Sequence, residues 1–374
     1  NYYCYIILRV MKPWIFLFCL ALPLLVSFVN SHSHNPHPYT LLYDTLTLEK
    51  PYLPANNPLT IEGIQLGRLL FYDPILSGNN QQSCGSCHQQ QYAFTDGQRL
   101  AIGAKGDTLS RNSIALMNLA WDKEYFWDGR EKSLEKAVRI PITYPTEMGQ
   151  DTIELIKELQ QHAHYPHLFE QAFGTSAISM DKTAKALAQF LRTIVTNGVH
   201  LPDSLLAQPP EGQTEQEFVM QQLHKPTLRG LYFRLADRCS GCHQDRLYAG
   251  TFMGNNKTTP KGTKMKIPPL INTAYTAPYM HDGRFATIRD VMKHYQKHID
   301  EFATVNDFQS LSPKYRESLD PQSGKSVIQL SNYDVENVEK LLHILSDTTI
   351  ITNKAYSNPF NQPNFDWTKF YNIP

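Results

Sequence analysis

Cys84-Gly85-Ser86-Cys87-His88 and Cys239-Ser240-Gly241-Cys242-His243 are two copies of one pattern, C-x-x-C-H. This pattern is the attachment signature of c-type haem. Its thiols form thioethers with the porphyrin, and its histidine binds the iron through a neutral imidazole nitrogen. A redox C-x-x-C pair or half of a zinc site is the alternative for a single copy. Two copies, each with the adjacent histidine, favour two covalently bound haem c groups. The attachment residues are then Cys84, Cys87, Cys239 and Cys242, and the iron ligands are His88 and His243.

A second repeat follows each motif. Residues 118–130 (NLAWDKEYFWDGR) align without gaps with residues 272–284 (NTAYTAPYMHDGR) at an offset of 154, and the two motifs are 155 residues apart. Similarity at a fixed period indicates a repeated structural unit. The sequence therefore predicts one haem domain that is duplicated, first at 40–200 and again at 213–350, with 201–212 as the linker.

Helical spacing of apolar residues runs through Thr152–Gln161, Asp181–Thr196, Thr287–His298 and Tyr333–Leu345. Alternating strand patterns are scarce. We therefore predict an all-α fold of two duplicated cytochrome c-type haem domains with long loops, in which the porphyrins supply part of the apolar core.

The N-terminal residues 1–31 have the features of a secretory signal peptide. Met11-Lys12 is followed by a nearly continuous apolar run, Trp14–Val29, and by small residues at 29–31. Residues 1–10 are interpreted as an upstream extension, and an uncleaved anchor is the alternative to cleavage. Because the two remaining cysteines, Cys4 and Cys19, lie within these 31 residues, the mature chain is expected to carry only haem-linked cysteines. This usage suits a periplasmic protein.

The composition is that of an ordinary globular chain. It has 374 residues, 41% hydrophobic content and a formal net charge of +0. The balanced charge gives no support for a nucleic-acid partner.

The ordered motifs resemble the bacterial di-haem cytochrome c peroxidases and the MauG-type enzymes of the same superfamily. The match spans roughly Thr60 to Leu345. Besides the two haem motifs it contains Arg111-Asn112, Phe126–Arg130, Glu147-Met148 and His281–Gly283. The resemblance implies that the first haem reacts with H2O2 and that the second receives electrons from a small donor protein, such as a cytochrome c or a cupredoxin. Family members are often homodimers, so a homodimer is compatible with the resemblance.

The resemblance also implies roles for individual residues. Glu147 corresponds to the catalytic carboxylate, since one positioned carboxylate can take a proton from one peroxide oxygen and deliver it to the other. Trp127 corresponds to a tryptophan between the haems. The structural alternative for Glu147 is a loop carboxylate, and the alternative for Trp127 is a packed core tryptophan. Asn112, Thr276 and Pro278 correspond to a Ca²⁺ site made of one side-chain oxygen and two carbonyl oxygens, donors that suit Ca²⁺.

Three positions depart from the family pattern. Ala104 stands where many family peroxidases carry a distal histidine, so we predict an open first haem; His162, His164 or His167 is the alternative ligand. Tyr295 stands where the peroxidases carry a methionine ligand of the second haem, and MauG-type enzymes have a ligating tyrosine at that position. Met292 is the alternative ligand. Ala137 replaces a glutamine that often accompanies the catalytic carboxylate.

The sequence thus favours a periplasmic di-haem peroxidase that reduces H2O2 with electrons from a small redox protein. A MauG-type oxidase that modifies residues of a partner protein is the first alternative. A di-haem electron carrier without catalysis is the second.

Overall fold

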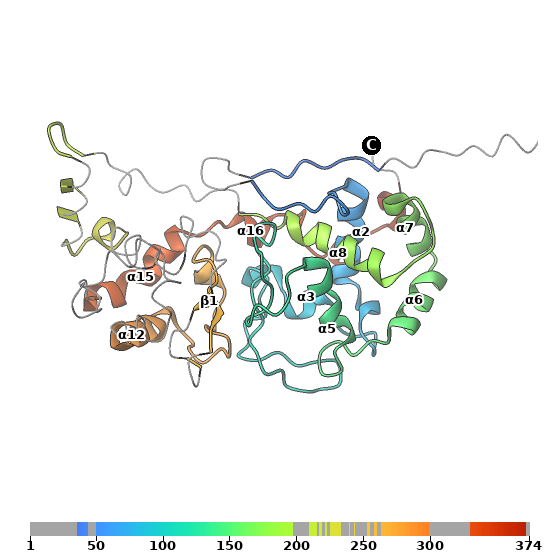
Figure 1. Cartoon of the computed structure of the whole chain (residues 1–374), viewed down its shortest axis with the longest axis horizontal. Coiled ribbons are helices and arrows are strands. Elements are labelled where there is room, and N and C mark those ends of the chain that lie inside the picture. Colours follow the sequence, from blue (N-terminus) through green and yellow to red (C-terminus); the bar gives the residue numbers. More distant parts are fainter. Residues whose placement is uncertain are drawn as a thin grey trace, which may run out of the picture. The chain divides into compact units, whose positions relative to one another are not determined.

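The computed structural model describes the greater part of the chain, and all the described residues belong to one compact unit, Pro36–Pro374. The described residues are 36–43, 50–196, 209–214, 217–218, 221–222, 225–232, 239, 243, 253–254, 258–259, 263–298 and 330–371 (Figure 1). The predicted signal peptide, most of the predicted linker and Cys242 lie outside them.

The four predicted helices are confirmed, with ends that shift by a few residues. They are α6 (Thr152–Gln161), α8 (Met180–Thr193), α12 (Ile288–His298) and α15 (Asn332–Ile344). The described residues are mostly helical and loop, and the sheet among them is one antiparallel pair of two-residue strands, β1 (Met253–Gly254) and β2 (Met265–Lys266). No helix in the described part of the chain is long and apolar enough to cross a membrane.

The first core is organised around α2 (Ile61–Tyr72), which lies against α8 and α7 (Tyr165–Phe173) (Figure 1). Two glycines let the helices approach closely. A Cβ atom added at Gly67 would lie 1.9 Å from the Ala186 carbonyl oxygen, and one at Gly63 would lie 2.3 Å from Gln189 Oε1. At Gly67 the nearest atoms belong to the main chain and cannot move aside, so the close pairing of α2 with α8 depends on this glycine. At Gly63 an added side chain would displace the Gln189 side chain.

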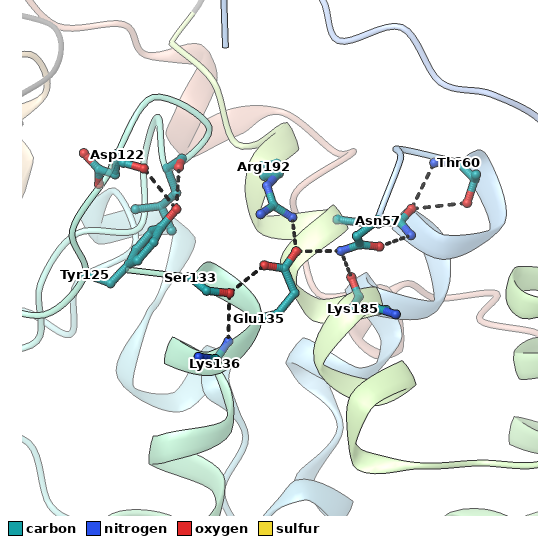
Figure 2. Close-up of polar contacts among 11 residues, drawn as sticks. Asn57, Thr60, Asp122, Tyr125, Ser133, Glu135, Lys136, Lys185 and Arg192 are labelled. Atoms are coloured by element: carbon teal, nitrogen blue, oxygen red, sulfur yellow. Dashed lines mark hydrogen bonds and ion pairs between the residues drawn. The ribbon is translucent and has the colours of Figure 1, made fainter. Parts of the chain in front are cut away.

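A buried polar network fixes α4 (Leu134–Ala137) against α8 (Figure 2). Glu135 Oε1 accepts hydrogen bonds from Arg192 at 2.6 Å and from Asn57 at 2.8 Å. The Arg192 side chain is 2% exposed and that of Glu135 is 18% exposed, so the pair is largely shielded from water. The segment that carries Glu147 begins with α4 and continues through α5 (Arg139–Thr143). The network therefore holds the first part of this segment in place.

The second core is smaller and lies between α12 and α15. Met292 from α12 and Val338 and Leu341 from α15 are buried within it. Ser331 caps α15 by accepting the Asp334 N–H at 3.2 Å, while Asp334 Oδ2 accepts the Ser331 N–H at 2.9 Å. This reciprocal capping box defines where α15 begins.

The last part of the chain, Thr349–Tyr371, returns to the first core, and we call it the C-terminal strap. It contains α16 (Thr349–Thr352), η9 (Pro359–Asn361) and η10 (Trp367–Phe370). Ile350 and Tyr356 are buried in the first core. The Tyr72 hydroxyl donates to the Tyr356 carbonyl oxygen at 2.6 Å, and the Tyr356 hydroxyl donates to the Thr193 carbonyl oxygen at 2.8 Å.

Candidate active site

The first C-x-x-C-H motif forms a single helical turn, α3 (Cys84–Cys87), and His88 follows it as the C-cap residue. The His88 N–H donates to the Cys84 carbonyl oxygen at 2.9 Å, and His88 Nδ1 donates to the Phe94 carbonyl oxygen at 2.9 Å. Burial lowers the pKa of His88. A neutral ring whose Nδ1–H is engaged in this way keeps its lone pair on Nε2, which is the arrangement that a metal-binding histidine needs.

The turn is closely packed against α2. A Cβ atom at Gly85 would lie 2.4 Å from Cδ1 of the Tyr72 ring. Burial and the neighbouring Cys87 raise the pKa of Cys84 to about 12. Burial, together with the charges of Asp96 and Glu147, raises the pKa of Cys87 to about 11. The charge of Glu147 is therefore close enough to Cys87 to affect the pKa of its thiol.

The second motif repeats the geometry of the first. The His243 N–H donates to the Cys239 carbonyl oxygen at 2.6 Å, and His243 Nδ1 donates to the Pro268 carbonyl oxygen at 2.6 Å. Burial lowers the pKa of His243 to about 4. Both histidines thus fit a haem, because each is a neutral imidazole with a defined tautomer. In the first motif the thiols of Cys84 and Cys87 accompany it and are partly buried.

Glu147 lies in the loop between α5 and α6 and is partly buried. Burial raises the pKa of its carboxyl group, and the charge of Arg130 opposes this effect. The Ala104 N–H donates to the Glu147 carbonyl oxygen at 2.7 Å. At the neighbouring Gly103, a Cβ atom would lie 1.8 Å from the Thr146 carbonyl oxygen. The position that departs from the family pattern, Ala104, is therefore a direct neighbour of Glu147.

The three histidines considered as alternative ligands all contact the C-terminal strap. The His164 ring stacks on Trp367 with centroids 4.8 Å apart, and His162 lies 5.1 Å from the same ring. His167 meets Tyr371 edge-on at 4.6 Å. Their described contacts are thus those of an aromatic cluster between α6, α7 and the strap.

Trp127 is held at its side chain and at its main chain. Its indole Nε1–H donates to the Asn112 carbonyl oxygen at 2.8 Å, and its own carbonyl oxygen accepts the Lys266 N–H at 2.6 Å. The preceding residue, Phe126, has a φ of 67°, a conformation that aromatic residues rarely adopt. The Arg130 guanidinium covers the Phe126 ring at 3.7 Å from its centroid, which helps to hold this turn.

The two aligned segments share several backbone features at equivalent positions. Positive φ values occur at Asn118 and Asn272, at Phe126 and Met280, and at Gly129 and Gly283. Isolated bridges join Tyr125 to Glu131 and, at the same offset, Tyr279 to Phe285.

The residues expected to bind Ca²⁺ are described, and Asn112 is buried. The Asn112 side-chain NH2 donates to the Gln98 carbonyl oxygen at 2.9 Å, and its main-chain N–H donates to the His281 carbonyl oxygen at 2.9 Å. Thr276 donates its hydroxyl to the Thr273 carbonyl oxygen at 3.2 Å, and Pro278 follows a cis peptide bond. Over the described ranges no group of three or more His, Cys, Asp or Glu side chains is arranged to hold a metal ion; the expected calcium ligands are of other types.

Both candidates for the distal ligand of the second haem lie on α12, three residues apart. Met292 is 5% exposed and belongs to the second core, whereas Tyr295 is partly buried and packs against that core from its edge. The His294 ring lies 5.9 Å from the Tyr295 ring.

Sequence reasoning missed the residues that orient these side chains. The carbonyl oxygens of Phe94 and Pro268 hold the two histidines, and Lys266 holds Trp127. The main-chain acceptors leave no signal in a sequence, because every residue carries a carbonyl group.

Together, the mostly helical fold and the two C-x-x-C-H turns define a protein built to hold haem. The family described as di-haem cytochrome c peroxidase matches residues 61–205. The MauG protein of Methylophilus methylotrophus is 30% identical over 258 residues, which are 65% of this chain and 75% of that protein. The cytochrome c551 peroxidase of Nitrosomonas europaea is 28% identical over 258 residues, 64% of this chain and 74% of that protein.

A solved structure of a MauG-like protein associated with microbial copper homeostasis superposes with a TM-score of 0.65 and 26% identity. The superposition covers 84% of this chain and 98% of the chain in that structure. This chain belongs to the di-haem cytochrome c peroxidase family, which includes the MauG proteins, and haem c is accordingly its cofactor.

Proposed function

We propose that this protein is a di-haem peroxidase, exported to the periplasm, that reduces H2O2 to two waters with two protons and two electrons. The electrons come from a small redox protein, either a cytochrome c or a cupredoxin. The observation that carries the proposal is the pairing of Glu147 with a loop that has Ala104 where a ligating histidine would stand. A site with a buried carboxylate and no such histidine suits the binding and protonation of peroxide.

In this proposal two haem c groups would be attached at the two motifs, with His88 and His243 as iron ligands. They would supply the iron chemistry and relay the electrons that the donor protein provides. His88, oriented by the Phe94 carbonyl group, presents Nε2 to the first of them. Glu147 takes a proton from one peroxide oxygen and returns it to the other, which makes that oxygen a better leaving group. Trp127 provides an aromatic bridge between the two sites, and Asn112, Thr276 and Pro278 bind Ca²⁺ near it.

The second candidate is a MauG-type oxidase that removes electrons from a side chain of a partner protein. It is favoured by Tyr295, which stands where the peroxidases carry methionine, and by the likeness to a MauG protein. The two functions differ in turnover: a peroxidase consumes reduced donor repeatedly, whereas the oxidase consumes peroxide only with its partner protein. A non-catalytic electron carrier would not react with peroxide at all.

Glu147→Gln tests the proposal. The substitution removes the titratable group and keeps its shape, so peroxide-dependent oxidation of a reduced cytochrome c should slow by about 10²- to 10⁴-fold. Glu154→Gln is the matched control, because Glu154 is exposed on α6 and pairs with Lys157 at 2.9 Å. Stopped-flow turnover, normalised to haem content by the pyridine haemochrome assay, provides the measurement. A wild-type protein that does not turn over cytochrome c or a cupredoxin, or a Glu147→Gln variant at full rate, would contradict the proposal.

A further inference from the structure

A buried ion pair lies next to Trp127. The Lys266 ammonium group on β2 contacts Asp122 Oδ2, and the two side chains are only 6% and 7% exposed. The removal of both charges from water costs free energy that their attraction offsets only in part, and an apolar pair often stabilises a fold equally well. Stability alone therefore gives little reason for a charged pair at this position.

The pair joins β2 to the segment that carries Trp127 at two separate points. The main-chain N–H of Lys266 donates to the Trp127 carbonyl oxygen at 2.6 Å, while its side chain holds Asp122, five residues earlier. The Tyr125 hydroxyl donates to the Asp122 carbonyl oxygen at 3.1 Å (Figure 2). Lys266 thus contacts both Asp122 and Trp127, and Tyr125 contacts Asp122.

The same stretch of chain also holds His243. Pro268, two residues after Lys266, accepts the hydrogen bond from His243 Nδ1 at 2.6 Å. Residues 266–268 therefore contact Trp127 at one end and His243 at the other. A displacement of this stretch would change the separation between the indole ring and the imidazole ring.

We propose that the Asp122–Lys266 pair is a positioning device that fixes the separation between Trp127 and His243 and thereby sets the rate of electron transfer between the two haems. Electronic coupling falls exponentially with distance, so a small displacement has a large effect on this rate. A charged pair suits the task because its two partners have few alternative contacts in a buried site. The inference rests on the proposed roles of the haems and of Trp127, which the test examines separately.

The test compares Asp122→Asn and Lys266→Met with Glu135→Gln in the holoprotein. Glu135→Gln breaks a different ion pair, Glu135–Arg192, in which Arg192 is buried and Glu135 is partly buried. Haem content, the urea midpoint of unfolding and the EPR signal of the second haem are recorded for each variant. Electron transfer between the haems is measured by flash photoreduction without peroxide. We expect Asp122→Asn and Lys266→Met to slow the transfer by about tenfold or more and to shift the EPR signal, and Glu135→Gln to lower the urea midpoint without either effect.

Each failure has its own signature. If Trp127→Leu, which removes the aromatic ring, transfers electrons at the wild-type rate, the role proposed for Trp127 is wrong and the inference falls with it. If Trp127→Leu is slow but Asp122→Asn is no slower than Glu135→Gln, the inference alone is overturned. Peroxide turnover does not enter either comparison, so the outcome stands apart from the peroxidase assay.

Discussion

At the scale of single residues, the two motif histidines share one arrangement. Each donates its Nδ1–H to a main-chain carbonyl oxygen, from Phe94 or from Pro268, and burial lowers the pKa of each ring. A carbonyl acceptor fixes the tautomer and the ring orientation without adding charge. Substitution of Phe94 or Pro268 would leave this carbonyl group in the chain, so the arrangement tolerates change of those side chains as long as the backbone holds.

Tyr295→Phe distinguishes the two candidate ligands on α12. If the phenol oxygen ligates the second haem, its removal should change the low-spin EPR signal of that haem, while haem content stays the same. Met292→Leu is the comparison, because a swap of similar volume in the core costs less than about 1.5 kcal/mol and should leave the signal unchanged. The reverse pattern, an altered signal in Met292→Leu only, would identify the thioether as the ligand.

At the scale of elements, the network around Glu135 joins α4 to α8 and to Asn57 (Figure 2). Burial alone would raise the pKa of Glu135, but hydrogen bonds from Arg192 and Asn57 outweigh it and lower the pKa from 4.5 to about 2. A carboxyl group with a depressed pKa in the folded state stabilises the fold above its unfolded pKa. This contribution is lost as the pH falls from about 4.5 toward about 2.

Glu135→Gln should lower the free energy of unfolding by about 3 kcal/mol at pH 7, because it leaves Arg192 buried without its partner. Urea unfolding followed by circular dichroism at pH 7, 4 and 3 gives the difference from wild type, which should shrink as the pH falls. Glu154→Gln, in an exposed ion pair, should change the free energy by less than about 1 kcal/mol throughout. A difference for Glu135→Gln that stays constant from pH 7 to 3 would show that the carboxylate charge is not the cause.

At the scale of the whole molecule, the C-terminal strap ties the end of the chain to the first haem motif. Gln90, two residues after His88, donates to the carbonyl oxygens of Ile350 and Asn353 at 3.0 and 2.8 Å. The Tyr72 ring packs against Gly85, and its hydroxyl group donates to the Tyr356 carbonyl oxygen in the strap. The first motif is therefore supported by residues that lie 260 or more positions later in the sequence.

Tyr356→Ala should destabilise the protein by about 3 to 5 kcal/mol, since it opens a cavity in the first core and removes a buried hydrogen bond. Thermal unfolding, monitored by circular dichroism, should show a lower midpoint. Tyr52→Ala provides a control with the same loss of atoms, because Tyr52 is 66% exposed, and its midpoint should stay close to that of wild type. Equal midpoints for the two variants would mean that the strap does not stabilise the first core.

The helices were predictable where the pattern was long and local. The apolar spacing predicts a helix over Thr152–Gln161, and α6 has these bounds in the structure, where Asp151 caps its first turn. The strand pair β1–β2 was not predicted, since each strand has two residues and its pairing depends on a partner eleven or more residues away. At the site, Glu147 was singled out from its motif, whereas its contact with Ala104 could be found only in the folded chain.

By itself, the sequence determined the haem chemistry, the mostly helical class and the family, because the thiols and the imidazole of each motif lie within one turn of chain and act locally. The tertiary structure decided which carbonyl groups orient His88 and His243, how Lys266 meets Asp122 and where the C-terminal strap packs. These contacts join residues as far apart as 144 positions for Lys266 and Asp122 and 284 positions for Tyr72 and Tyr356. At such separations no spacing rule links the partners, and only the packing of the cores brings them together.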